Sequence, residues 1–154
     1  MMTPASTTDR IHKEITLRAP RARIWRALTD AGEFGAWFGV ELDSGFQAGQ
    51  TVRGRITSPG CESLRFEATV EWLRPEESFA FRWSPCGDGT QPAAADAPST
   101  LVEFRLDGVD GAVRLTVTES GFDTLPADQR RELFARNEGG WAIQVENFRR
   151  HVDG

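Results

Sequence analysis

Apolar and polar residues alternate over much of this chain, and the alternation predicts strands wherever it holds. Residues 11–17 alternate first, with Ile11, Lys13, Ile15 and Leu17 on one side and polar side chains on the other. Helical spacing replaces the alternation between residues 21 and 38, where two short apolar turns follow each other. The pattern therefore predicts a half-buried strand followed by two short helices.

Period two returns from Val40 onward and is interrupted by turn signals rich in Gly, Pro and Asp. This punctuation predicts about six strands in an antiparallel meander. The opposite face of these strands carries charges of both signs, and we expect it to be solvated and paired across strands. The positions expected on the apolar face are Leu64, Phe66, Ala68, Val70, Trp72, Phe79, Phe81, Trp83, Val102, Phe104, Leu106, Val113, Leu115 and Val117.

A long helical pattern closes the chain, with Trp141, Val145, Phe148 and Val152 along one stripe. A twisted sheet with one apolar face needs a cover, and this helix is the element long enough to supply it. We therefore predict a single α+β domain at residues 11–152, in the order strand, two helices, six strands and helix.

Two segments stand apart from this pattern. Residues 1–10 are small and polar, and we expect a flexible N-terminal segment. Residues 84–99 are rich in Ala, Pro, Gly and Asp, which predicts a mobile loop within the domain.

Composition narrows the classes of function. The formal net charge is -5 and basic residues are scattered, so we expect no nucleic-acid partner. No stretch suits a signal peptide or a membrane span, and we expect a cytoplasmic protein, either monomer or homodimer. Cys61 and Cys86 are better explained as free thiols than as a disulfide. His12 and His151, both expected at the surface, offer a metal few ligands, so we expect neither metal nor cofactor.

Gly139 and Gly140 stand side by side within the last helical pattern, directly before Trp141. Each glycine inside a helix costs about 1 kcal/mol relative to alanine. We expect the pair to let the backbone pass close to another segment and to direct Trp141 inward. Asn137 and Glu138, just before them, are either rim contacts or N-terminal helix caps, and caps are the preferred interpretation.

Three stretches in this order, "IWRALTDAGEFGAWF", "VTESGF" and "NEGGWAIQVENF", resemble the START-related superfamily, also called SRPBCC. Within it they are most similar to the branch named after the activator of the ninety-kilodalton heat-shock protein ATPase. The resemblance covers about residues 11–152. It implies a helix-grip fold, in which a curved antiparallel sheet wraps the C-terminal helix and leaves an apolar cavity. It also implies a ligand in that cavity, and members of this superfamily differ widely in ligand and activity.

Nine residues are candidates for lining such a cavity, and ordinary core packing is the preferred interpretation of each apolar one. They are Trp37, Phe38, Phe66, Trp83, Phe104, Glu119, Trp141, Val145 and Phe148. Glu119 is the polar member, and alternation after Val117 turns it inward, where it could hold a ligand hydroxyl or amine. The preferred interpretation is that it lies in water at the strand end or caps a neighbouring backbone group.

These candidates support three hypotheses about function. The first is the binding of an apolar small molecule, such as a lipid, polyketide or aromatic metabolite. The second is a polyketide cyclase or aromatase with Glu119 as general acid or base. The third is a stress-response module with a chaperone partner.

Overall fold

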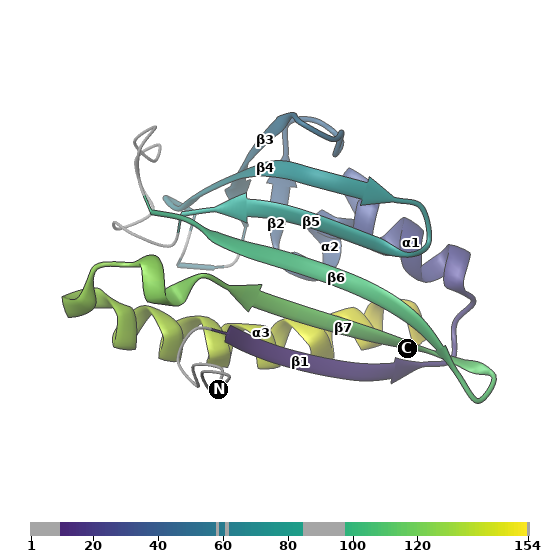
Figure 1. Ribbon diagram of the computed structural model, residues 1–154. Coiled ribbons are helices and arrows are strands. Elements are labelled where there is room, and N and C mark those ends of the chain that lie inside the picture. The colour runs from purple at the N-terminus through teal and green to yellow at the C-terminus, as the bar shows by residue number, and fades with distance from the viewer. Residues whose placement is uncertain (1–9, 58, 61, 85–97, 154) are drawn as a thin grey trace, which may run out of the picture.

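The computed structural model describes residues 10–57, 59–60, 62–84 and 98–153, and contains one sheet and three α-helices (Figure 1). The strands are β1 (Arg10–Leu17), β2 (Val40–Leu42), β3 (Thr51–Ile56), β4 (Arg65–Arg74), β5 (Ser78–Trp83), β6 (Thr100–Val109) and β7 (Ala112–Ser120). The helices are α1 (Arg21–Thr29), α2 (Ala31–Phe38), the 3-10 turn η1 (Phe122–Thr124) and α3 (Ala127–Asp153). The predicted order of elements is confirmed.

All seven strands form one antiparallel sheet in the order β1-β7-β6-β5-β4-β3-β2. The chain thus runs as a meander from β2 to β7, and β1 joins at the far edge beside β7. Figure 1 shows the sheet bending around the helices, with α3 running along β1 and β7. This is the helix-grip arrangement of a curved sheet and a long C-terminal helix. Among the described residues, no helix combines the length and apolar character that a membrane crossing needs.

The helices cover the apolar face of the sheet. Helix α2 starts at Asp30, whose carboxylate accepts from the Glu33 amide at 2.9 Å, and it ends at Gly39, which has φ +88°. That left-handed residue turns the chain sharply into β2. Helix α3 has 27 residues and is about 40 Å long, so its first half extends past the ends of β1 and β7 (Figure 1). The site discussed below lies where α3 meets those strand ends.

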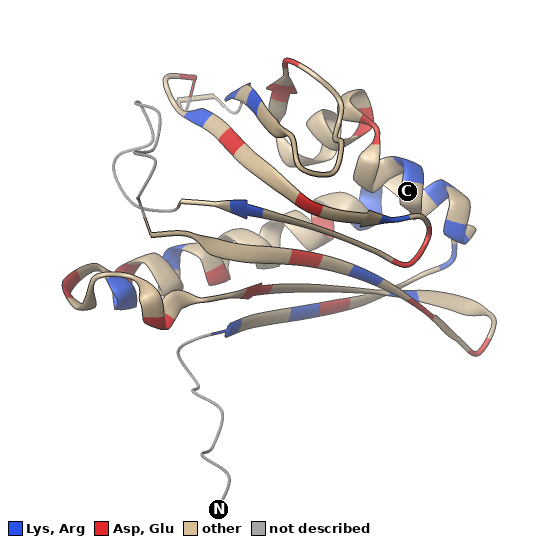
Figure 2. Cartoon of the chain, turned by 45° about the horizontal axis from the view of Figure 1, so that its top comes forward, with Lys and Arg blue, Asp and Glu red and all other residues tan. Residues whose placement is uncertain are grey.

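The outer face of the sheet is polar, as the alternation predicts. Figure 2 shows basic and acidic positions along the same strands. Arg53 Nε lies 2.9 Å from Glu67 Oε2, and Arg82 Nε lies 3.1 Å from Glu71 Oε1. Such half-exposed pairs each contribute about 1 kcal/mol or less. The outer face is therefore a solvated surface with cross-strand pairs.

The inward position predicted for Trp72 is wrong. Val70 pairs with Phe81, but Trp72 pairs with Ala80, so Glu71 is an extra residue in a β-bulge. The bulge reverses the alternation and turns Trp72 to the outer face. There its indole donates to Ser78 Oγ at 3.0 Å. The other predicted inward residues of β4 to β7 fit their assignment, and those from Phe66 to Val70 are buried.

Two expectations for α3 are also wrong. The helix begins at Ala127, so Asn137 and Glu138 lie within it and cannot be its N-terminal caps. Gly139 and Gly140 are exposed, and a Cβ at either would meet nothing within 4 Å in the described part of the chain. No close backbone passage explains the glycine pair, although Trp141 after it is buried as expected.

Candidate functional site

Glu119 is fully buried and is the hub of a polar network between the sheet and α3. Four side chains donate to its carboxylate. Trp141 Nε1 donates to Oε1 at 2.8 Å, Trp83 Nε1 to Oε2 at 2.8 Å and Thr100 Oγ1 to Oε2 at 2.6 Å. The Asn137 amide nitrogen lies 3.1 Å from both oxygens. We call the carboxylate and its four donors the Glu119 network. The network ties three strands to the final helix.

Strand register explains why these residues meet. Trp83 ends β5 and pairs with Thr100, the first residue of β6. Glu119 lies near the end of β7 and pairs with Val102, which faces inward two residues after Thr100. Because paired residues share a face, Trp83, Thr100 and Glu119 all point toward α3 at the same end of the sheet.

Helix α3 completes the network from the other side. Asn137 and Trp141 are four residues apart and therefore lie one turn above each other on the same face. The Asn137 oxygen is occupied by Arg136 Nε at 3.2 Å, which leaves the amide nitrogen directed at Glu119. Asn137 therefore contacts the site. The sequence analysis had named such a contact as the alternative to a helix cap.

Thr100 is the network residue that the sequence analysis missed. Its signal was present, because the inward series Leu106, Phe104 and Val102 continues to Thr100 when it is extended by one step. A small polar residue at the start of an apolar strand is easily assigned to the loop before it.

The seven aromatic candidates form one connected cluster of rings beside this network. The centroid distances are 5.0 Å for Trp37 and Phe148, 6.4 Å for Trp37 and Phe104, and 5.9 Å for Phe104 and Trp141. Such distances are typical of packed aromatic pairs. In this structure the rings themselves therefore occupy the space between the sheet and the helices.

On one side the aromatic cluster is only partly covered and reaches the surface. Phe38, Trp83 and Val145 are half-buried, whereas Phe66 and Trp141 beside them are buried. Phe38 lies 6.2 Å from both Trp83 and Trp141, measured between ring centroids. We call Phe38, Trp83 and Val145 the aromatic rim. Among the seven rings of the cluster, Phe38 and Trp83 are the ones that are partly exposed to solvent.

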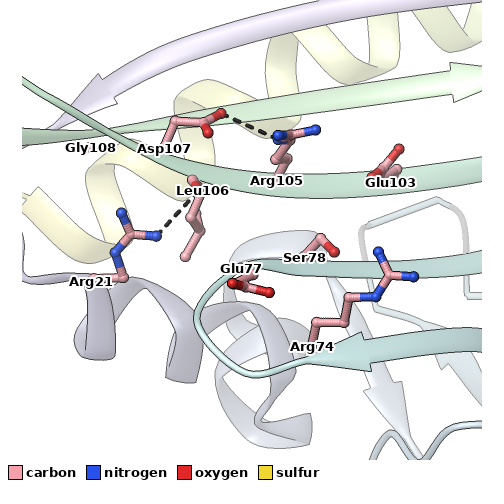
Figure 3. A pocket seen from close by; sticks show the side chains of 9 residues that line it. All are labelled: Arg21, Arg74, Glu77, Ser78, Glu103, Arg105, Leu106, Asp107 and Gly108. Carbon is pink, nitrogen blue, oxygen red and sulfur yellow. Dashed lines mark hydrogen bonds and ion pairs between the residues drawn. The ribbon is translucent and has the colours of Figure 1, made fainter.

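A cleft of about 370 Å³ lies on the outer face of the sheet, between the start of α1 and the β4–β5 hairpin (Figure 3). Its polar lining comes from Arg21, Arg74, Glu77, Ser78, Glu103, Arg105, Leu106, Asp107 and Gly108. Arg21 is engaged with the carbonyls of Glu76 and Leu106, and Arg105 Nε lies 3.5 Å from Asp107. Three cations and three carboxylates balance each other there, so we interpret the cleft as a gap between solvated side chains.

A second charged cluster joins α2 to the end of α3. Arg23, Arg26 and His151 all contact the Glu33 carboxylate, with 3.1 Å between His151 Nε2 and Glu33 Oε1. Burial raises the pKa of Glu33. Hydrogen bonds from His151 and the arginines together lower the pKa by more than burial raises it, so the net shift is downward. The surface position expected for His12 is confirmed, whereas His151 is half-buried and holds the end of α3 in place.

Three sequence expectations lie outside the described residues. These are the thiol states of Cys61 and Cys86 and the mobility of most of the 84–99 segment. The flexibility of residues 1–10 is likewise described only at Arg10, which already belongs to β1.

Comparison with known proteins agrees with this architecture. The family described as Activator of Hsp90 ATPase homolog 1-like protein matches residues 18–153. A search of curated proteins found no match. Among solved structures, DynU16 of the dynemicin biosynthetic locus is 25% identical with a TM-score of 0.72. The match covers 94% of this chain and 47% of DynU16, so this chain spans about half of that protein.

Two further structures match over nearly their whole length and show the same fold. Protein MLL2253 from Mesorhizobium loti is 20% identical, with a TM-score of 0.73 and coverage of 94% of this chain and 96% of that one. The Aha1 dimer from Colwellia psychrerythraea is 17% identical, with a TM-score of 0.69 and coverage of 93% and 95%. Because the family match includes α1 to α3 and every strand after β1, this chain belongs to the Activator of Hsp90 ATPase homolog 1-like family.

Proposed function

We propose that this protein binds an apolar small molecule between the sheet and α3, in the class of lipids, polyketides or aromatic metabolites. The observation that carries the proposal is the aromatic cluster, which is continuous from the buried Phe148 to the half-buried aromatic rim. A purely structural core has no need to bring large rings to solvent at one place. The family fold also supports a hydrophobic ligand-binding domain in general.

Ligand entry requires the rim to move, because the rings are in contact in this structure. Phe38 is the residue with the freedom to do so, since it has a solvent-facing side, whereas the Trp83 indole is held by its hydrogen bond to Glu119. Displacing Phe38 exposes Phe66 and Trp141, whose rings lie 5.6 Å and 6.2 Å from that of Phe38. The site is thus a collapsed pocket in this account, and its opening offsets part of the binding energy.

An enzymatic role for Glu119 has weaker support from the same geometry. An ionised carboxylate accepts at about four positions, and four donors already contact this one. A general base needs a free lone pair within reach of the substrate proton. The Glu119 network therefore suits a positioning role that holds both tryptophans in place.

Substitution at the rim tests the binding proposal. Val145→Trp places a larger side chain against the core one helical turn after Trp141, and it should weaken binding of an environment-sensitive apolar fluorophore by about tenfold or more. Ile143→Trp is the matched control, because Ile143 is 64% exposed on the same helix. Fluorescence titration measures both affinities. Equal affinities for the two variants and the unchanged protein would contradict a site at the rim.

A further inference from the structure

The Glu119 network surrounds a carboxylate with hydrogen-bond donors, an arrangement that suits the ionised, acceptor-only form, and it supplies no cationic partner. Its four donors, two indoles, a hydroxyl and an amide, are all neutral. Within the described ranges, no Lys, Arg or His forms an ion pair with Glu119. Residues 1–9 and 85–97 contain no basic side chain in their sequence. Buried charges in proteins are normally paired, so this one stands out.

The nearest link to a cation is indirect. Arg136 reaches the network by donating to the Asn137 oxygen, and the Arg136 side chain is exposed. Lys13, on the neighbouring strand, is 3.7 Å from Glu138 Oε1 and is engaged there. The charge of Glu119 is therefore stabilised by hydrogen-bond dipoles and remains felt in the apolar space around it, where the effective dielectric constant is low.

Both tryptophans transmit this charge to their ring faces. Each indole donates its N–H to the same carboxylate, which polarises the ring toward a more negative face. The Trp83 and Trp141 centroids are 5.9 Å apart with planes tilted by 31°, so a ligand does not fit between them. The accessible side of the pair is the half-buried Trp83, next to Phe38 at the rim.

We infer that the ligand of this protein carries a positively charged group, an ammonium on an apolar or aromatic body, which lies over the Trp83 face at the rim. This rests on the proposed function, since it names the chemical class of the molecule that the same site binds. The cation does not contact Glu119 directly, because the carboxylate is fully occupied by its donors. It is held by cation–π attraction within about 6 Å of the ring centroid and by the uncompensated charge behind the ring.

Three probes of matched shape test the inference on the unchanged protein. They are naphthylmethylammonium, naphthylmethanol and naphthoate, titrated by calorimetry at neutral pH and physiological ionic strength. The expected result is that the ammonium binds about tenfold more tightly than the alcohol, with naphthoate weakest. Equal affinities, or naphthoate as the tightest, would overturn the charge preference while the proposed apolar site stands. Binding of none of the three would overturn both.

Two variants locate the origin of the preference. Glu119→Gln should reduce the ratio of the ammonium affinity to the alcohol affinity, both measured on the same variant, from about tenfold to about twofold. Glu14→Gln makes the same change in net charge at a 52% exposed side chain on β1, and should keep the tenfold advantage. If both variants lose it equally, the preference comes from the overall charge of the protein and the assignment to Glu119 is wrong. The comparison of the three probes needs no variant and decides the preference whether or not Glu119→Gln folds.

Discussion

Replacing Glu119 by glutamine tests how much the Glu119 network stabilises the fold. Glutamine keeps one oxygen and replaces the other with an amino group. With the oxygen in place of Oε1, Trp141 and Asn137 keep their acceptor, and the amino group can donate to Thr100. The Trp83 indole then loses its acceptor. The substitution therefore leaves one donor without a partner and makes the remaining bonds neutral.

The magnitude follows from these contacts. An unsatisfied buried donor costs about 1 to 3 kcal/mol, and the change from charged to neutral acceptor costs about 1 kcal/mol for each of two retained bonds. Removing a buried charge offsets part of this loss, because its desolvation is no longer required. We expect Glu119→Gln to lower the free energy of unfolding by about 2 to 4 kcal/mol.

Urea unfolding followed by far-ultraviolet circular dichroism measures this value from the midpoint and slope. Glu14→Gln, with its carboxylate 52% exposed, should change it by no more than about 0.5 kcal/mol. Trp141→Phe removes one donor, and the double variant with Glu119→Gln should be less destabilised than the sum of the two single variants. An effect of Glu119→Gln as small as that of Glu14→Gln, or strict additivity with Trp141→Phe, would refute the reasoning.

Two further predictions concern α3 and its attachment. Gly139→Ala and Gly140→Ala should each raise the free energy of unfolding by about 1 kcal/mol, because both positions are helical and open; a lower thermal midpoint would show that the glycines are required. Since the pKa of Glu33 is lowered in the folded state, the stability it contributes is present above about pH 4.3 and is lost as the pH falls through the lowered pKa. Urea midpoints from about pH 7 to about pH 3 should therefore fall less steeply for Glu33→Gln than for the unchanged protein, and parallel curves would contradict the coupling.

The sequence predicts the fold well because alternation and helical spacing record which side of each element is buried. Val113, Leu115 and Val117 set a phase that correctly turns Glu119 inward. The same rule fails at Trp72, because the extra residue of the bulge at Glu71 has no sequence signal and shifts the phase of the remaining residues of β4. Local periodicity thus predicts faces only as far as the register stays regular.

The partners of Glu119 were beyond such reasoning. Trp83, Thr100 and Trp141 are 36, 19 and 22 residues away from it along the chain. Their meeting depends on strand register and on the position of α3 along the sheet, neither of which a single sequence specifies. The role of Asn137 could not be decided from the sequence for the same reason. A polar residue before two glycines can be either a helix cap or a long-range contact.

The position of β1 has a consequence for how the protein is made. This strand pairs with β7 alone, and Asp153 at the end of α3 accepts from the amides of Arg18 and Ala19 that follow it. During synthesis β1 emerges from the ribosome before the other strands of this sheet, whereas its partner strand emerges about a hundred residues later and its tether on α3 later still. Nascent chains therefore carry a half-apolar strand that waits unpaired, and this domain completes its folding only after α3 has emerged.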